Sequence, residues 1–120
     1  MFALTEAHQF FVYKRPTDMR KSFNGLSGLV RSELNKNPLS GNVYIFINKR
    51  RNLMKLLHWQ QGGFVLYYKR LEKGQFEIDF DKNNQSQIEI SYTKLTMIIA
   101  GISTQNIKQL KRFSKQNCML

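Results

Sequence analysis

Three short runs rich in β-branched and aromatic residues follow one another closely in the middle of this 120-residue chain. They cover Val43–Asn48, Leu53–Trp59 and Phe64–Arg70, and a connector of four residues joins each run to the next. This composition is typical of β-strands, and connectors this short favour hairpins. The pattern therefore predicts an antiparallel meander.

The segment before the meander predicts a strand followed by a helix. Residues His8–Arg15 have the aromatic and β-branched content of a short strand. Pro16 ends this strand, because proline lacks the N–H that a strand interior needs. Apolar residues then recur every three or four positions, which predicts a helix over Asp18–Asn35.

The segment after the meander is expected to add a hairpin and a second helix. The hairpin pairs Phe76–Phe80 with Gln87–Ser91, and the helix covers Thr93–Ala100. Together these elements predict an α+β fold, in which an antiparallel β-meander sheet of about four to five strands carries two helices packed on one face. Residues 1–102 are expected to form this single domain, and residues 103–120 a basic C-terminal tail that is either a marginal helix or disordered.

Positive charge is concentrated in the first part of the chain. The 120 residues include 19 Lys and Arg against 8 Asp and Glu, which gives a net charge of +11. Residues 7–71 contain twelve basic and two acidic residues, whereas residues 72–89 contain two basic and five acidic ones. A field this one-sided favours polyanions such as nucleic acid or an anionic membrane surface. A surface that only confers solubility is the alternative.

The meander would gather much of this charge at one end of the sheet. Because chain direction reverses at each hairpin, the third run should finish where the first run finished. The hairpin-end cluster expected there consists of Lys49, Arg50, Arg51, Lys55, Lys69 and Arg70. Six cations repel one another unless an anion binds among them, so this cluster is the first candidate for nucleic-acid binding. Alternatively, basic hairpin tips only discourage aggregation.

A second basic cluster surrounds the predicted start of the first helix. It consists of Lys14, Arg15, Arg20 and Lys21. Cations are unfavourable at a helix N-terminus, which is the positive end of the helix dipole. Their presence is consistent with a helix start that receives a phosphate. In the alternative interpretation, Arg20 and Lys21 point outward and pair with Asp18.

Aromatic residues lie among the basic ones and offer a second mode of nucleic-acid binding. On an exposed sheet face such side chains can stack on bases. Filling the core is their commoner use, and the signature of an RNA-recognition sheet is absent. The side chains concerned are Tyr13, Tyr44, Trp59, Tyr67 and Tyr68.

Features that indicate catalysis are scarce. The two histidines are His8 and His58, and His58 lies within an apolar strand candidate. A two-metal nuclease needs several converging carboxylates, but the basic part of the chain contains only Asp18 and Glu33. The single cysteine, Cys118, has no partner for a disulfide or a zinc site. We therefore expect no enzyme, cofactor, metal or small-molecule substrate. We also expect no membrane association, because no apolar stretch is long enough to span a bilayer.

Three stretches of the chain together resemble a known protein family. In order and spacing they are similar to the small accessory protein, called TnpB or the product of the second open reading frame, of insertion sequences of the sixty-six type. The similarity runs from about Gln9 to Gly101. The stretches are Arg15–Lys21 with Phe23 and Gly25–Leu26, Ser40–Gly41 with Phe46 and Asn48–Arg51, and Lys55–Trp59 with Gly63–Gly74.

The resemblance implies a bacterial mobile-element protein that binds DNA and assists a separate transposase. The partners that it implies are duplex DNA, including the element's ends, together with the transposase and the other accessory protein of the same element. Its implied location is the cytoplasm, at the nucleoid. In the alternative interpretation the protein is an interaction subunit that docks onto the transposase with little DNA affinity of its own, and RNA remains open as a ligand. The family often has Asp where this chain has Asn24, and Trp-Pro where it has Ile78-Asp79.

Overall fold

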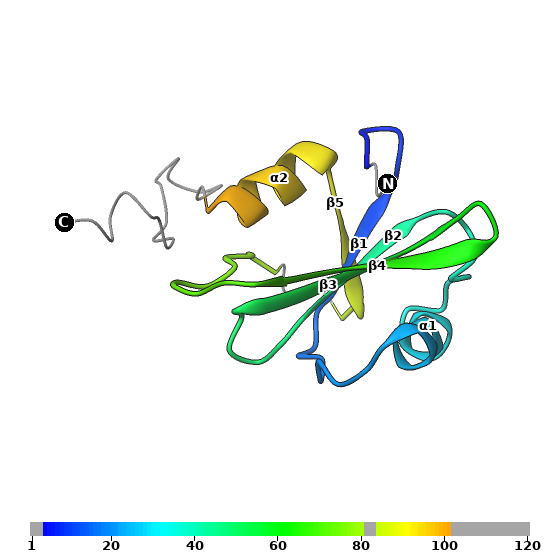
Figure 1. Cartoon of the computed structure of the whole chain (residues 1–120), viewed down its shortest axis with the longest axis horizontal. Coiled ribbons are helices and arrows are strands. Elements are labelled where there is room, and N and C mark those ends of the chain that lie inside the picture. The colour runs from blue at the N-terminus through cyan, green and yellow to red at the C-terminus, as the bar shows by residue number, and fades with distance from the viewer. Residues whose placement is uncertain (1–3, 81–83, 102–120) are drawn as a thin grey trace.

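A five-stranded sheet with a helix on each face forms the body of the protein (Figure 1). This architecture comes from a computed structural model that describes residues 4–80 and 84–101. The α+β class and a sheet of five strands are therefore confirmed. The elements in chain order are β1 (Phe10–Tyr13), α1 (Phe23–Ser32), β2 (Val43–Ile47), β3 (Leu53–Gln60), β4 (Gly63–Arg70), β5 (Gln87–Ile90) and α2 (Tyr92–Ala100).

The central meander is confirmed. Strands β2, β3 and β4 are consecutive antiparallel neighbours, and the sheet has the order β4-β3-β2-β1-β5. The β3–β4 turn is tight because Gln61 and Gly62 both have positive φ values, 50° and 82°, as the favoured two-residue hairpin requires. In the β2–β3 turn, the side chain of Asn48 accepts hydrogen bonds from the backbone N–H groups of Asn52 and Leu53.

Among the strands that the structure describes, β1 and β2 form the one parallel pair. Phe10 lies opposite Val43 and Val12 lies opposite Ile45. The chain between them contains α1, and a parallel pair needs a crossover connection of this kind. The C-terminal ends of both strands therefore lie at the same end of the sheet, although the strands are far apart in the sequence.

The expectation that both helices pack on one face of the sheet is wrong. Leu26, Val30 and Leu34 from α1 and its C-terminal end pack against one face, whereas Leu95 and Ile98 of α2 pack against the other. Figure 1 shows the sheet almost edge-on between them. The physical reason is that all residues of β1 and β2 are buried. A sheet that is apolar on both faces has to be covered on both.

Both helices begin at residues other than those expected. Helix α1 begins at Phe23 rather than Asp18, because Asp18 instead closes a local turn by accepting a hydrogen bond from the N–H of Arg20. Helix α2 begins one residue earlier than expected, and Ser91 caps it by accepting a hydrogen bond from the N–H of Lys94. Gly101 ends α2 in the left-handed conformation, with φ of 82°, as is common after a helix.

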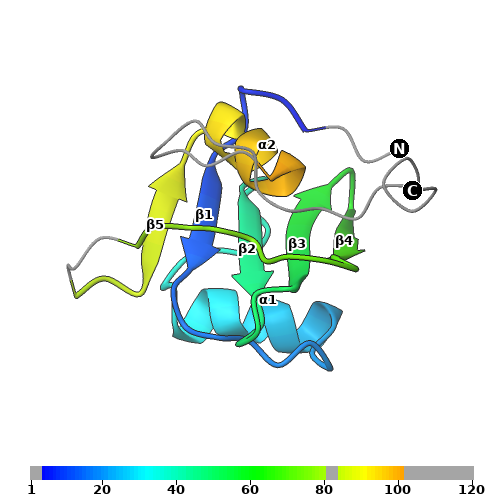
Figure 2. The ribbon, with the colours of Figure 1, turned by 90° about the vertical axis from the view of Figure 1, so that its left-hand side faces the viewer.

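The expected hairpin between Phe76–Phe80 and Gln87–Ser91 is also wrong. Residues 71–80 form no strand and cross the end of the sheet from β4 toward β5 (Figure 2). The alternation of apolar and acidic residues that suggested a strand is real, because Phe76 and Ile78 are buried on the α2 face while Glu77 and Asp79 are exposed. β5 pairs with β1 at the far edge, so the connection has to cross the sheet. Residues 81–83 and the predicted tail 103–120 lie outside the described residues.

Candidate nucleic-acid interface

The parallel pair β1–β2 brings the two basic clusters predicted from the sequence together. The backbone N–H of Thr17 donates to the carbonyl oxygen of Ile47 (2.9 Å), so the chain leaving β1 runs beside the end of β2. In the β3–β4 register, Leu53 lies opposite Arg70 and Met54 opposite Lys69. We call this end of the sheet, where β1, β2 and β4 end and β3 begins, the basic end. Its cations are Lys14, Arg15, Arg20, Lys21, Lys49, Arg50, Arg51, Lys69 and Arg70.

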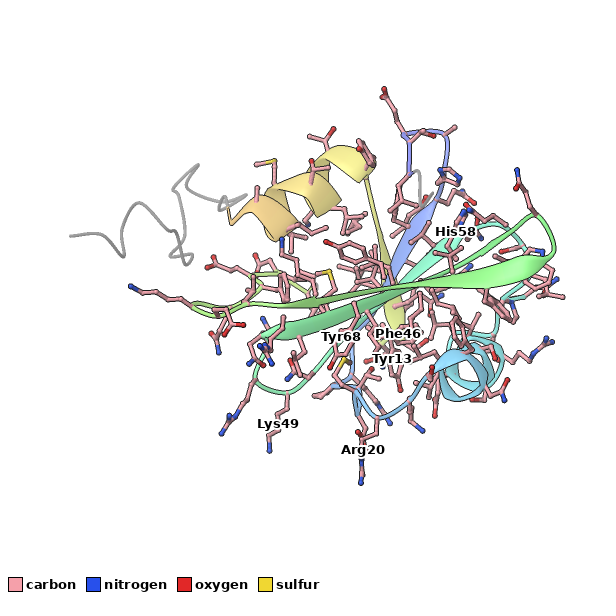
Figure 3. All side chains as sticks on the ribbon, viewed as in Figure 1. Tyr13, Arg20, Phe46, Lys49, His58 and Tyr68 are labelled. Atoms are coloured by element: carbon pink, nitrogen blue, oxygen red, sulfur yellow. The ribbon has the colours of Figure 1, made fainter. Side chains whose placement is uncertain are left out.

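Most of these cations are accessible. Lys14, Arg51 and Lys69 are half-buried, and the other six are exposed. The side chains of Lys49 and Arg20 both project away from the body on the α1 side of the sheet (Figure 3). Positive charge from the β1–α1 loop and from the β2–β3 turn therefore faces the same region of solvent.

Lys55 does not join the exposed cluster. Its side chain is only 5% exposed. The ammonium donates to the carbonyl oxygens of Met19 (2.8 Å) and Lys21 (2.7 Å), and it lies 4.6 Å from the centroid of the Tyr68 ring. The predicted role of Lys55 as a phosphate contact is therefore inconsistent with its position. It instead fixes the segment that carries Arg20 and Lys21 against β3.

Arg51 ties the β2–β3 turn to the crossing segment. Its guanidinium donates to the carbonyl oxygen of Ile78 (3.2 Å) and lies 5.4 Å from the centroid of the Phe80 ring. The backbone N–H of Phe76 donates to the carbonyl oxygen of Arg51 (2.6 Å). The guanidinium of Arg51 thus makes contacts that stabilise the fold. Its neighbours Lys49 and Arg50 are exposed instead.

Two arginines of the basic end form ion pairs. Arg20 pairs with Asp18 (2.7 Å) and Arg70 with Glu72 (2.8 Å). Hydrogen bonds from the side chain and backbone N–H of Arg20 lower the pKa of Asp18 to about 2. The alternative in which Arg20 pairs with Asp18 is therefore what the structure shows, and both residues precede α1 rather than lying in its first turn. Exposed pairs of this kind contribute little stability and exchange readily.

A cavity of about 170 Å³ lies where β1 and β2 end. Its lining combines cations from both clusters, Lys14, Arg15, Lys49 and Arg51, with the apolar side chains of Phe76, Ile78 and Phe80. The cavity thus marks the point at which the two clusters meet.

The five aromatic residues considered as base-stacking candidates differ in burial and in the face of the sheet on which they lie. Tyr13 and Tyr44 are buried on the α1 face, and the Tyr44 hydroxyl donates to the carbonyl oxygen of Asn37. Trp59 packs edge-on against Phe64, and Tyr67 packs on the α2 face. Tyr68, on the α1 side of β4, is 52% exposed. Alternation along β4 in the sequence predicts that Tyr67 and Tyr68 lie on opposite faces of the sheet. It does not predict that α1 leaves the Tyr68 side of β4 uncovered.

Comparison with known proteins assigns the chain to a family. Residues 8–109 match the family described as IS66 Orf2-like protein. The chain belongs to this family. The resemblance seen in the sequence is thereby confirmed, and the IS66 Orf2-like family is one of insertion-sequence accessory proteins.

Relatives of this IS66 Orf2-like chain occur in Sinorhizobium fredii (strain NBRC 101917 / NGR234). The uncharacterized protein y4jC is 29% identical over 101 residues, which cover 84% of this chain and 85% of y4jC. The uncharacterized protein y4hO is 33% identical over 100 residues, which cover 82% of this chain and 84% of y4hO. No solved structure matches the chain.

The two histidines of the IS66 Orf2-like domain lie side by side at the opposite end of the sheet from the basic end. The His58 ring is 2% exposed, and its centroid is 4.9 Å from that of His8. Burial lowers the pKa of His58. Among residues 4–80 and 84–101, no three His, Cys, Asp or Glu side chains are grouped as metal ligands would be, and no helix there is long and apolar enough to cross a membrane.

Proposed function

We propose that this IS66 Orf2-like protein is a non-catalytic accessory protein of its insertion sequence that binds DNA through the basic end. The observation that carries the proposal is the parallel pairing of β1 with β2. That pairing places cations from separate parts of the sequence on one surface. Cations held this close together repel one another, and a polyanion relieves the repulsion.

The distribution of acids supports an approach of DNA from the α1 side. Glu77 and Asp79 are exposed on segment 71–80, whose alternate residues Phe76 and Ile78 pack on the α2 face. Lys49 and Arg20, by contrast, project on the α1 side (Figure 3). A phosphate backbone is attracted to the second surface and repelled by the first. The acid next to Arg20, Asp18, is held in an ion pair, which is a structural use and not a catalytic one.

The proposal includes assistance to a separate transposase at the element's ends, in the cytoplasm at the nucleoid. It also allows contact with the transposase and with the other accessory protein of the element. A second candidate function, docking onto the transposase with little DNA affinity, is favoured by the position of β4. This eight-residue strand is an edge of the sheet, and such an edge offers backbone groups for pairing with another chain.

A titration of duplex DNA binding against salt tests the proposal. Neutralising about five phosphates would give a slope of log affinity against log salt of about −4 to −5. A slope near zero would exclude this mechanism. Strong co-purification with the transposase in high salt, together with weak DNA binding by the protein alone, would support the docking function instead.

Two double variants of equal charge change locate the surface. Lys49→Ala with Arg50→Ala removes two exposed cations of the basic end, and about two phosphate contacts would reduce the salt slope by about 2. Arg31→Ala with Lys94→Ala removes one cation from the last turn of α1 and one from the first turn of α2, neither of which belongs to the basic end, and serves as the control. Equal affinities for the two variants would show that the binding surface lies elsewhere.

A further inference from the structure

Tyr68 is the most exposed large hydrophobic side chain among the described residues. It is 52% exposed, compared with 43% for Phe23 and for Leu39. It lies on the edge strand β4, two residues before that strand ends at Arg70. The DNA-binding role proposed above uses only cations and leaves this aromatic ring unexplained.

A buried cation holds the Tyr68 ring in place. Lys55 lies directly opposite Tyr68 in the β3–β4 register, and its Nζ is 4.6 Å from the ring centroid. This ammonium is itself fixed by hydrogen bonds to the carbonyl oxygens of Met19 and Lys21. A cation–π contact to an anchored cation restricts the Tyr68 ring before any ligand binds. Ligand binding to the ring therefore costs little further conformational entropy of the Tyr68 side chain.

The surroundings of Tyr68 combine an apolar wall with a positive charge. A recess of about 160 Å³ is lined by Leu53, Tyr68 and Arg70. Leu53 lies opposite Arg70 in the register, and the Arg70 guanidinium is engaged with the exposed Glu72 (2.8 Å). An exposed pair of this type exchanges for a stronger anionic partner at little cost. The recess therefore suits a flat, apolar group with an anion attached.

We infer that Tyr68 stacks on an unpaired base of DNA, while Arg70 contacts a neighbouring phosphate. The inference rests on the proposed DNA-binding function and adds the form of DNA that the site takes. The faces of bases inside a duplex are covered by their neighbours, so only a single strand, an end or an opened step presents a free face. Stacking of this kind tolerates any base, because every base has a π-face.

Substitutions at Tyr68 separate stacking from general hydrophobic contact. Tyr68→Leu keeps an apolar side chain but removes the ring, whereas Tyr68→Phe and Tyr68→Trp keep a ring. The probes are an oligothymidylate of about 12 nucleotides and a duplex several times longer, in which base pairs with covered faces far outnumber the two ends, each measured by fluorescence anisotropy. Because Tyr68 is exposed, the variants are expected to fold, and circular dichroism spectra and thermal melts establish whether they do.

The expected result is a loss confined to the single strand. Tyr68→Leu should bind oligothymidylate about tenfold more weakly and the duplex with unchanged affinity, and the Phe and Trp variants should match the wild type. An equal loss for both probes, or no loss for either, in a folded Tyr68→Leu variant would overturn the stacking inference while leaving DNA binding intact. If the wild-type protein bound neither the oligothymidylate nor the duplex, the proposed function itself would be refuted.

Discussion

The Nζ of Lys55 donates a hydrogen bond of 2.7 Å to the backbone oxygen of Lys21, 34 residues earlier in the chain. One lysine is thus buried in order to position another that is exposed. The same ammonium also holds the carbonyl oxygen of Met19. These two hydrogen bonds hold the loop between β1 and α1 against β3 through its backbone oxygens.

Replacing Lys55 with methionine should loosen this loop. The two carbonyl oxygens lose a charged donor, which is expected to lower the free energy of unfolding by about 1–3 kcal/mol. Chemical denaturation measures this loss, and faster tryptic cleavage after Arg20 and Lys21 would locate it. Lys69→Met is the matched control, because Lys69 lies one strand away and is half-buried. Equal stability and equal cleavage of the two variants would contradict the anchoring role.

Neutralising Asp18 should strengthen DNA binding. Asp18→Asn removes the carboxylate that pairs with Arg20 but keeps a side-chain oxygen to accept from the N–H of that residue. The released guanidinium and the added unit of charge should raise affinity about two- to fivefold at low salt. Glu6→Gln makes the same charge change at an exposed position before β1, at the end of the sheet opposite the basic end. If Glu6→Gln raised affinity as much as Asp18→Asn, net charge rather than position would be responsible.

The buried histidine should make stability depend on pH. Burial holds the pKa of His58 below its ordinary value of 6.5, so the unfolded chain binds this proton more readily than the folded chain does. Stability from His58 is therefore complete above about pH 6.5 and falls as the pH is lowered toward its folded-state pKa. Thermal melts between pH 7.5 and 5.5 should show a smaller decrease for His58→Asn than for the wild type. His8→Asn is the control, and an unchanged decrease in the His58 variant would contradict this assignment.

The crossing segment should respond to substitution at alternate positions. Phe76 is 0% exposed in the core under α2, so Phe76→Ala is expected to cost about 3–5 kcal/mol of unfolding free energy. The neighbouring Glu77 is exposed, and Glu77→Ala should change stability by less than about 0.5 kcal/mol. Denaturant titrations measure both. Similar values for the two variants would be inconsistent with the observed packing of residues 71–80.

Local features of the sequence predicted the meander because short connectors leave few arrangements for β2, β3 and β4. Pairing of β1 with β2 joins segments on either side of α1, and no local pattern specifies that pairing. The sequence therefore indicates two separate basic clusters. Strand β2 (Val43–Ile47) is apolar on both faces, and this pattern does indicate that both faces of the sheet are covered.

The burial of Lys55 had a detectable signal. It occupies the same face of β3 as Leu57, which lies in the core beneath α1. A lysine at a core-facing position of a strand is a candidate for internal hydrogen bonding. What the sequence alone does not contain is its partner, because the acceptors are backbone oxygens of the β1–α1 loop.

The parallel contact between β1 and β2 couples ligand binding to the integrity of the fold. Lys14 and Arg15 meet Lys49 and Arg50 only while these two strands are paired, so the unfolded chain has no equivalent arrangement. A polyanion that bridges the two sides would therefore bind the native state in preference and raise the melting temperature as its concentration rises. Bound nucleic acid would then raise the free energy of unfolding of the protein.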